Sequence, residues 1–186
     1  MRLCPLGIAA VFTVAMESLK SAGAISISST DSLPVHTPYD YREDYVFPTH
    51  RLKTTPDDPS KIPLVLVACG SFSPITYLHL RMFEMALDFV NDREQFEIMG
   101  GYFSPVSDDY KKADLAHHTH RVRMIEMAVG DSPWLMVDDW EASQKSFVRT
   151  VSVLDHFERQ LKGKISSDKP VRIMLLAGGD LIQSFA

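Results

Sequence analysis

The chain has 186 residues, of which 45% are hydrophobic and 23% are charged, an ordinary balance for a globular protein with one core. Its net charge is −5, and lysine and arginine do not form a block anywhere in the sequence. Binding to a long nucleic acid needs a basic stripe, so this class of function is disfavoured. The two cysteines, Cys4 and Cys69, are too few for a disulfide framework or a cysteine-based zinc site and fit a reducing compartment.

The first residues leave two interpretations open. An apolar run over residues 3–16 followed by small residues at 22–24 resembles a secretory signal with its cleavage site. Glu17 and Lys20 interrupt that pattern, the stretch is too poor in arginine for a mitochondrial presequence, and translation from Met16 is an alternative start. We therefore expect an intracellular protein, cytoplasmic or nuclear. No stretch of the sequence has the roughly 20 apolar residues of a membrane span, so we expect no membrane partner.

The chain divides into two parts by composition. Residues 25–61 are rich in serine, threonine, proline and aspartate and show no apolar period. We interpret residues 1–61 as an N-terminal extension that is mostly disordered or extended. Residues 62–186 are expected to form the ordered domain.

Within that domain, short apolar runs alternate with segments whose apolar residues recur at helical spacing. In chain order, the expected elements are a strand at 64–68, a helix at 77–90, a strand at 95–103, a helix at 121–129, a strand at 134–137, a helix at 146–162 and a strand at 171–177. This order predicts an α/β fold with a doubly wound parallel sheet and right-handed crossovers. Because the sequence ends soon after the last strand, we expect the sheet to be incomplete at its C-terminal edge.

The turn between the first strand and the first helix has the chemistry of a ligand site. Ligands of open α/β sheets bind at the carboxyl ends of strands, and this turn begins at Gly70, where a glycine lets the backbone approach a ligand. Thr76 is a favourable helix N-cap, which places His79 in the first helical turn, where free N–H groups attract phosphate. The alternative is a plain strand-to-helix turn with a capping threonine and an incidental histidine. The Gly-Lys-Ser/Thr ending of a P-loop is absent.

The motif Gly70-x-Phe72-x-Pro74-x-Thr76-x-x-His79 resembles the opening signature of eukaryotic, fungal-like nicotinamide or nicotinate mononucleotide adenylyltransferases. Four further motifs follow in the order of that family and cover the chain to about residue 185. They are Ser104-Pro105-Val106-x-Asp108-x-Tyr110-Lys111-Lys112, His120-Arg121-Val122, Val137-Asp138-x-Trp140-Glu141 and Gly178-x-Asp180-Leu181. The resemblance implies a Rossmann-like nucleotidyltransferase domain.

The resemblance also implies roles for particular residues. His79 corresponds to the histidine that contacts the ATP phosphates and stabilises the transition state, and Lys112 to a lysine near the reacting phosphates, so both are expected to be catalytic. The residues expected to bind ATP or the dinucleotide are Gly70, Ser71, Phe72, Thr76, Gly178 and Asp180. The residues expected to bind the mononucleotide are Tyr110, Trp140 and Glu141.

Each role has a structural alternative. Tyr110 and Lys112 fit an ordinary solvated loop, and Asp180 fits a helix cap. Trp140 fits the core, although its acidic neighbours favour the exposed end of a loop. Arg121 has the weakest functional claim, since a role in the fold explains it.

A cluster of histidines raises the question of a metal site. His117, His118 and His120 lie in a polar segment with no cysteine or carboxylate at ligand spacing. We interpret them as surface residues and expect no protein-bound metal.

The implied reaction transfers the AMP moiety of ATP to nicotinamide or nicotinate mononucleotide, forming NAD or its deamido form and pyrophosphate. ATP with Mg²⁺ and the mononucleotide are the expected partners, and a homo-oligomer is compatible with the sequence. The family's second signature, a Ser-Ser/Thr-x-x-Arg string that grips ATP phosphates, is absent at the C-terminal end, so we expect a C-terminally truncated domain with little activity. The alternatives are another member of the nucleotidyltransferase superfamily, or a non-catalytic fragment or degenerate copy.

Overall fold

The computed structural model describes residues 42–178, which contain four strands and three helices in strict alternation. In chain order these are β1 (Ile62–Gly70), α2 (Tyr77–Asn91), β2 (Phe96–Pro105), α3 (His118–Ala128), β3 (Leu135–Val137), α4 (Thr150–Leu161) and β4 (Arg172–Leu176). Every expected element is present. The largest differences in bounds are at the starts of α3 and α4, which lie next to loops that hold functional residues.

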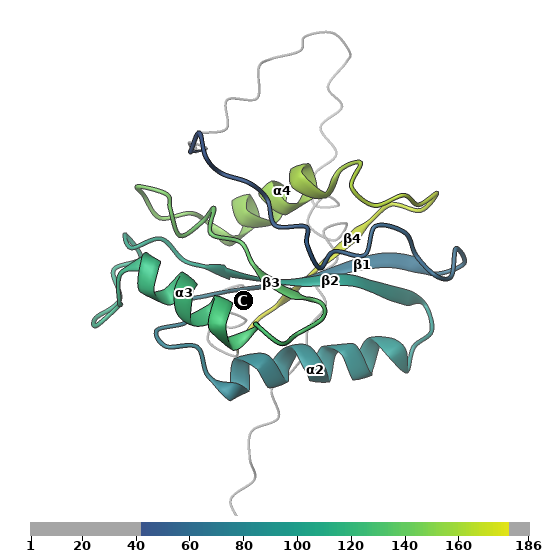
Figure 1. The fold of residues 1–186 in the computed structure, drawn as a ribbon, viewed down its shortest axis with the longest axis horizontal. Helices are drawn as coiled ribbons and strands as arrows, with labels where there is room; N and C mark the ends of the chain where they lie inside the picture. Colours follow the sequence, from purple (N-terminus) through teal and green to yellow (C-terminus); the bar gives the residue numbers. More distant parts are fainter. Residues whose placement is uncertain (1–41, 179–186) are drawn as a thin grey trace, which may run out of the picture.

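The four strands form one parallel sheet in the order β3-β2-β1-β4 (Figure 1). The chain moves from β1 outward to β2 and β3 and then returns to add β4 on the other side of β1. This order confirms the predicted doubly wound parallel sheet. In such a sheet the crevice at the carboxyl ends of the two strands where the order reverses, here β1 and β4, is the usual ligand site.

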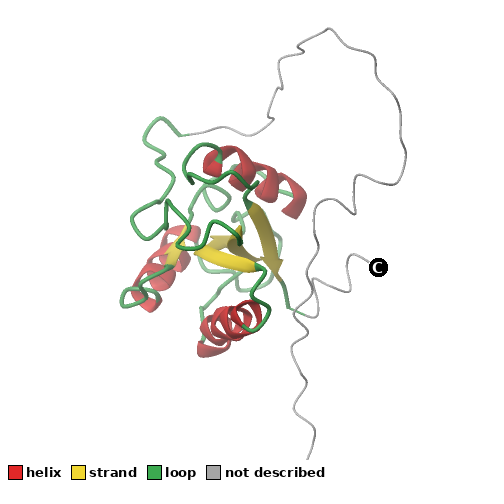
Figure 2. Ribbon diagram, turned by 90° about the vertical axis from the view of Figure 1, so that its right-hand side faces the viewer, coloured by secondary structure: helices red, strands yellow, loops and turns green. Residues whose placement is uncertain are grey.

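Helices cover both faces of the sheet. In Figures 1 and 2, α2 and α3 lie against one face and α4 lies against the other. Alternate residues of β1 supply the two cores, because successive side chains of a strand point to opposite faces. Leu64 and Leu66 pack with the α2 residue Phe83. Val65 and Val67 pack in the cluster that includes the α4 residue Phe157.

The segment before β1 is part of the packed domain. Residues 42–61 form no helix or strand, although the backbone N–H of Lys53 donates to the Met99 carbonyl oxygen of β2 at 2.8 Å. However, Phe47 and Leu52 are 6% and 7% exposed and belong to the core on the α4 side of the sheet. The packed domain therefore begins upstream of Ile62, where the sequence analysis placed its start, because two isolated apolar side chains find the sheet without forming a periodic pattern. Residues 1–41 lie outside the described part of the chain.

Arg51 fastens this segment to the far edge of the sheet. Its guanidinium donates to the carbonyl oxygens of Val129 at 2.6 Å, Leu135 at 2.8 Å and Gly130 at 2.7 Å. The three acceptors lie at the end of α3 and the start of β3, so one side chain joins the segment to two elements.

Within residues 42–178, none of the helices has the length and apolar character needed to cross a membrane.

Candidate functional site

The β1–α2 turn is built as the sequence predicts. Thr76 is the N-cap of α2, with extended backbone angles of φ −132° and ψ 166°, and His79 lies in the first helical turn. The Nδ1 atom of His79 accepts a hydrogen bond from the Thr76 backbone N–H at 2.9 Å and lies 2.9 Å from Thr76 Oγ1. The side chain thus satisfies one of the N–H groups that a helix start leaves without a partner.

This contact determines which ring nitrogen of His79 can act as a hydrogen-bond donor. Because Nδ1 accepts from a backbone N–H, the proton of the neutral ring is on Nε2. Partial burial lowers the pKa of His79, since burial penalises the charged form. The ring is half-buried, with the edge of Phe72 against it at a centroid distance of 5.1 Å. At neutral pH it therefore presents one N–H donor without carrying a charge.

Phe72 shapes the turn from inside. Its backbone is in the left-handed region at φ 44°, an uncommon conformation for a non-glycine residue that is often found at functional sites. The residue is only 3% exposed and its ring packs against Phe103, so Phe72 supports the turn from the core, and its contact with a nucleotide stays a prediction. A Cβ added to Gly70 would lie 3.0 Å from that ring. A glycine at position 70 therefore leaves room for the Phe72 ring, and the expected approach of a ligand to Gly70 stays a prediction.

The catalytic candidate Lys112 reaches the same turn from the β2–α3 loop. Its Nζ donates to Ser71 Oγ at 3.1 Å, so two motifs that are 41 residues apart in the sequence meet at the carboxyl end of β1. Lys112 and His79 supply positive charge and a hydrogen-bond donor around one turn. This is the combination that a phosphate group needs.

Arg121 joins the β1–α2 turn to the β2–α3 loop from inside the domain. It is fully buried and donates to the carbonyl oxygens of Ser71, Val106 and Ala116 and to Asp108 Oδ1, all at 2.7–3.0 Å. These contacts support the structural interpretation of Arg121. Its substitution would disturb the site through the position of Ser71 rather than through contact with a ligand.

Tyr110 lies in an open hollow of about 750 Å³. The hollow is lined by Asp109, Tyr110, Lys111, Lys112 and Phe147. Tyr110 and Phe147 stack at 5.7 Å with an interplanar angle of 28° and are both partly exposed. The sequence analysis missed Phe147, although an aromatic residue in a polar stretch just before an amphipathic helix was a usable signal. Two aromatic rings beside two lysines suit a ligand with a flat ring and a phosphate.

Trp140 and Glu141 follow β3 but are not exposed at the end of a loop. They are 1% and 2% exposed, so the expected exposed position of Trp140 is wrong. Its ring stacks on that of His156 in α4, with a centroid distance of 4.0 Å and an interplanar angle of 3°. Ser104 Oγ donates to Glu141 Oε2 at 2.5 Å. Their role in binding the mononucleotide stays a prediction.

The environment of Glu141 changes its chemistry. The pKa of Glu141 is raised to about 8, chiefly by burial and also by the charge of Asp138, against the lowering effect of the Ser104 hydrogen bond. The carboxyl group is therefore mostly protonated at neutral pH. Burial also raises the pKa of the Cys69 thiol well above its usual value, so this free cysteine at the end of β1 is a packing residue.

The sequence analysis did not predict a polar cluster of Asp138, His156 and Tyr45. Asp138 and His156 are fully buried, with 3.0 Å between Asp138 Oδ2 and His156 Nε2. Tyr45 donates its hydroxyl to Asp138 Oδ1 at 2.8 Å. This group joins the end of β3, helix α4 and the segment before β1, directly beneath Trp140.

The last candidates lie at the end of β4. Gly178 is exposed, and a Cβ added to it would meet nothing within 4 Å. It follows β4, whose Leu176 is paired with Ala68 near the end of β1, so it lies at the same end of the sheet as the β1–α2 turn. Asp180 lies outside the described residues.

One conclusion of the sequence analysis is contradicted by the geometry. The histidines at the start of α3 do have a carboxylate partner, because Asp108 Oδ2 lies 2.7 Å from His118 Nδ1 and 3.3 Å from His117 Nε2. The loop that follows β2 folds back onto the start of α3 and brings together residues that are distant in sequence. His120 is exposed and is not part of this group.

A doubly wound parallel sheet with a phosphate-type turn after its first strand defines an α/β protein of the nucleotide-binding class. Comparison with known families places it within that class. The chain belongs to the cytidylyltransferase-like family, whose model matches residues 67–186.

Individual relatives are more specific. The chain is 59% identical over 150 residues to nicotinamide/nicotinic acid mononucleotide adenylyltransferase 2 of Saccharomyces cerevisiae, which covers 76% of this chain and 38% of that protein. It is 56% identical to nicotinamide/nicotinic acid mononucleotide adenylyltransferase of Schizosaccharomyces pombe, over 76% of this chain and 40% of the relative. It is 41% identical to the Arabidopsis thaliana enzyme of the same name, over 76% of this chain and 60% of the relative. The chain spans less than half the length of the fungal relatives that it matches.

Proposed function

We propose that this chain serves the transfer of the AMP moiety of ATP to nicotinamide or nicotinate mononucleotide, giving NAD or its deamido form and pyrophosphate. The observation that carries the proposal is the β1–α2 turn, where His79 is locked by its Nδ1 contact to Thr76 and Lys112 arrives on Ser71. The similarity to adenylyltransferases of that specificity in fungi and plants supports the choice of substrates.

The chemistry asks little of the protein as an acid or base. The 5′-phosphate of the mononucleotide is itself the nucleophile, so no serine, cysteine or activating base is needed. The protein has to hold two anionic substrates in line and stabilise charge on the departing pyrophosphate. The first turn of α2 supplies N–H groups, His79 supplies the Nε2–H donor, and Lys112 supplies a positive charge.

The hollow beside Lys112 has side chains that suit the second substrate. Tyr110 and Phe147 offer ring faces to a base, and Lys111 and Lys112 offer charge to its phosphate. This arrangement supports a role on the mononucleotide side of the site for Phe147, which sequence reasoning missed.

The side chains at the turn also bear on Mg²⁺. His79 and Lys112 are hydrogen-bond donors and suit phosphate oxygens rather than a metal ion, so Mg²⁺ that accompanies ATP would be held chiefly by phosphate oxygens and water. When bound, it would neutralise charge on the triphosphate.

Nucleotide binding by the purified chain tests the proposal most directly. We expect saturable ATP binding in isothermal titration calorimetry, weakened by roughly 10- to 100-fold in His79→Gln, the cost of a lost hydrogen bond to a charged group. Glutamine at this position retains a capping-box partner for Thr76, so helix α2 is preserved. His50→Gln, at an exposed histidine outside the turn, is the matched control and should bind as the parent does.

A second measurement examines the reaction itself. The chain is incubated with ATP, Mg²⁺ and either mononucleotide, and the dinucleotide is measured by mass spectrometry. Dinucleotide formation that is lost in His79→Gln supports the proposal. Absence of ATP binding, equal binding by the parent and His79→Gln, or selective binding of CTP would contradict it, the last in favour of cytidylyl transfer.

A further inference from the structure

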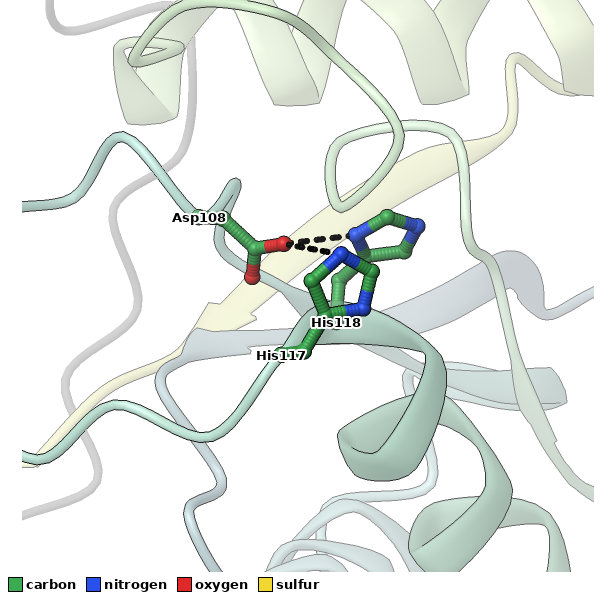
Figure 3. Close-up of side chains that lie close together, drawn as sticks. All are labelled: Asp108, His117 and His118. Carbon is green, nitrogen blue, oxygen red and sulfur yellow. Dashed lines mark hydrogen bonds and ion pairs between the residues drawn. The ribbon is translucent and has the colours of Figure 1, made fainter.

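A cluster of possible metal ligands lies near the β1–α2 turn, linked to it by Arg121, which contacts both Ser71 and Asp108. Asp108 in the β2–α3 loop points its Oδ2 between the imidazoles of His117 and His118, which stand at the N-cap and first residue of α3 (Figure 3). The distances are 2.7 Å to His118 Nδ1 and 3.3 Å to His117 Nε2. The three ligand-type atoms all lie within 4.8 Å of one another.

Neighbouring contacts orient these three side chains. The other carboxylate oxygen of Asp108, Oδ1, is held by the buried guanidinium of Arg121 at 2.8 Å. The other ring nitrogen of His117, Nδ1, lies 2.9 Å from Thr119 Oγ1. Such outer contacts fix the ring and carboxylate orientation of metal ligands in known sites. Here they leave Asp108 Oδ2 facing both His117 Nε2 and His118 Nδ1.

We propose that Asp108, His117 and His118 bind a divalent transition-metal ion of the zinc class. Two imidazole nitrogens and one carboxylate oxygen form a set that suits Zn²⁺ and disfavours Mg²⁺ and Ca²⁺, which prefer oxygen ligands. Three protein ligands leave the fourth tetrahedral position to water, and the 59% exposure of the His117 side chain provides access.

The spacing of the ligand atoms is close to what the ion needs. Zinc bonds of about 2.0–2.1 Å in a tetrahedron place ligand atoms about 3.3 Å apart. The His117–Asp108 distance already has this value, and the His118–Asp108 distance has to open by about 0.6 Å. The third pair, His117 Nε2 and His118 Nδ1, lies within 4.8 Å, so zinc binding requires a small adjustment of these partly exposed side chains. Zinc then replaces the hydrogen-bonding protons that now join the rings to the carboxylate.

The local charges set the strength of binding. Asp108 contributes the one negative charge, while Arg121 and the positive end of α3 oppose a cation. The ion would therefore bind reversibly rather than as a permanent structural metal. Its effect would be to tie the β2–α3 loop, which carries Tyr110 and Lys112, to the start of α3.

Zinc titration of the chelator-treated chain tests this proposal without any nucleotide. We expect one equivalent of Zn²⁺ to bind in calorimetry, and Co²⁺ to give the visible absorption of a four-coordinate site. His117→Ser removes one imidazole but keeps a favourable N-cap, and His118→Ala removes the other. Each should weaken Zn²⁺ binding by at least about tenfold, a loss that even an outer contact of a metal site can cause, and the double variant should abolish the Co²⁺ signal.

His120→Ala provides the matched control, because it removes an exposed imidazole on the same helix that is not part of the group. Its Zn²⁺ affinity should equal that of the parent. Circular dichroism of each variant in chelator establishes that the fold is retained. Failure of the parent to bind Zn²⁺, or equal binding by the parent and the folded double variant, would overturn the proposal. Neither result would affect ATP binding at His79.

Discussion

At the level of single residues, the buried carboxyl group of Glu141 gives the domain a specific dependence on pH. Its pKa is raised from 4.5 to about 8, so between these values the folded chain keeps a proton that the unfolded chain releases. Raising the pH through this window therefore lowers the free energy of unfolding, and the loss levels off above about pH 8. At about 1.4 kcal/mol per pKa unit, the total effect is on the order of a few kcal/mol.

Glu141→Gln tests this linkage, because it removes the charge and retains an oxygen that accepts from Ser104. We expect urea unfolding to show that the stability of the variant relative to the parent rises steadily from pH 5 to pH 8. Glu158→Gln, at an exposed carboxyl group on α4, should show no such trend. A constant difference between Glu141→Gln and the parent would mean that the carboxyl group is ionised in the folded chain.

Single residues also show what a sequence can predict about this site. The spacing of Thr76 and His79 determines a contact within one helical turn, so their arrangement could be predicted. The burial of Trp140 could not, because it depends on stacking against His156, which α4 supplies. The metal-type group was missed for the same reason, since Asp108 reaches His118 only when the loop after β2 folds back.

At the level of elements, β2 is tightly packed at Gly101. A Cβ at this position would lie 2.6 Å from Leu135 Cδ2 and 2.8 Å from the ring of Trp134. Phe83 Cε1 would lie 3.0 Å away on another side, and Leu135 and Phe83 are both buried, so these side chains have little room to shift. We expect Gly101→Ala to destabilise the domain by about 1–3 kcal/mol, the usual cost of an overpacked core.

The neighbouring residue provides the comparison on the same strand. A Cβ at Gly100 would meet Leu52 Cδ1 at 3.3 Å and Met136 Cε at 3.4 Å, both ends of flexible side chains that can move. Gly100→Ala should therefore unfold at a higher urea concentration than Gly101→Ala. Equal midpoints for the two variants would show that the contact with Leu135 is relieved without cost.

The elements themselves were largely predictable, and the reason is their burial. Strands covered on both faces read as unbroken apolar runs, as residues 64–68 do, and the helices between them show one apolar stripe. The start of α3 was predicted three residues late because polar histidines occupy its first turn. The start of α4 was predicted four residues early because Phe147, an apolar residue, belongs to the loop at the hollow.

At the level of the whole molecule, the domain is completed by a segment that no periodic pattern reveals. The contacts that attach it include Phe47 in the core, Arg51 at the sheet edge, and the Tyr45 hydroxyl on Asp138. The Tyr45 contact bears on the candidate site, because Asp138 is paired with His156 and the ring of His156 stacks on Trp140. The segment therefore connects the stability of the sheet with the geometry of the residues that follow β3.

Phe47 and its neighbour Val46 test whether this segment is structural. Phe47 is 6% exposed and its ring contacts Tyr102 and Phe157 at 5.1 and 5.8 Å, whereas Val46 is 82% exposed. Phe47→Ala should cost about 3–5 kcal/mol in urea unfolding, because it leaves a cavity between the sheet and α4. Val46→Ala should change stability by no more than about 0.5 kcal/mol. If both variants unfold at the midpoint of the parent, the segment is an appendage and the domain begins at β1.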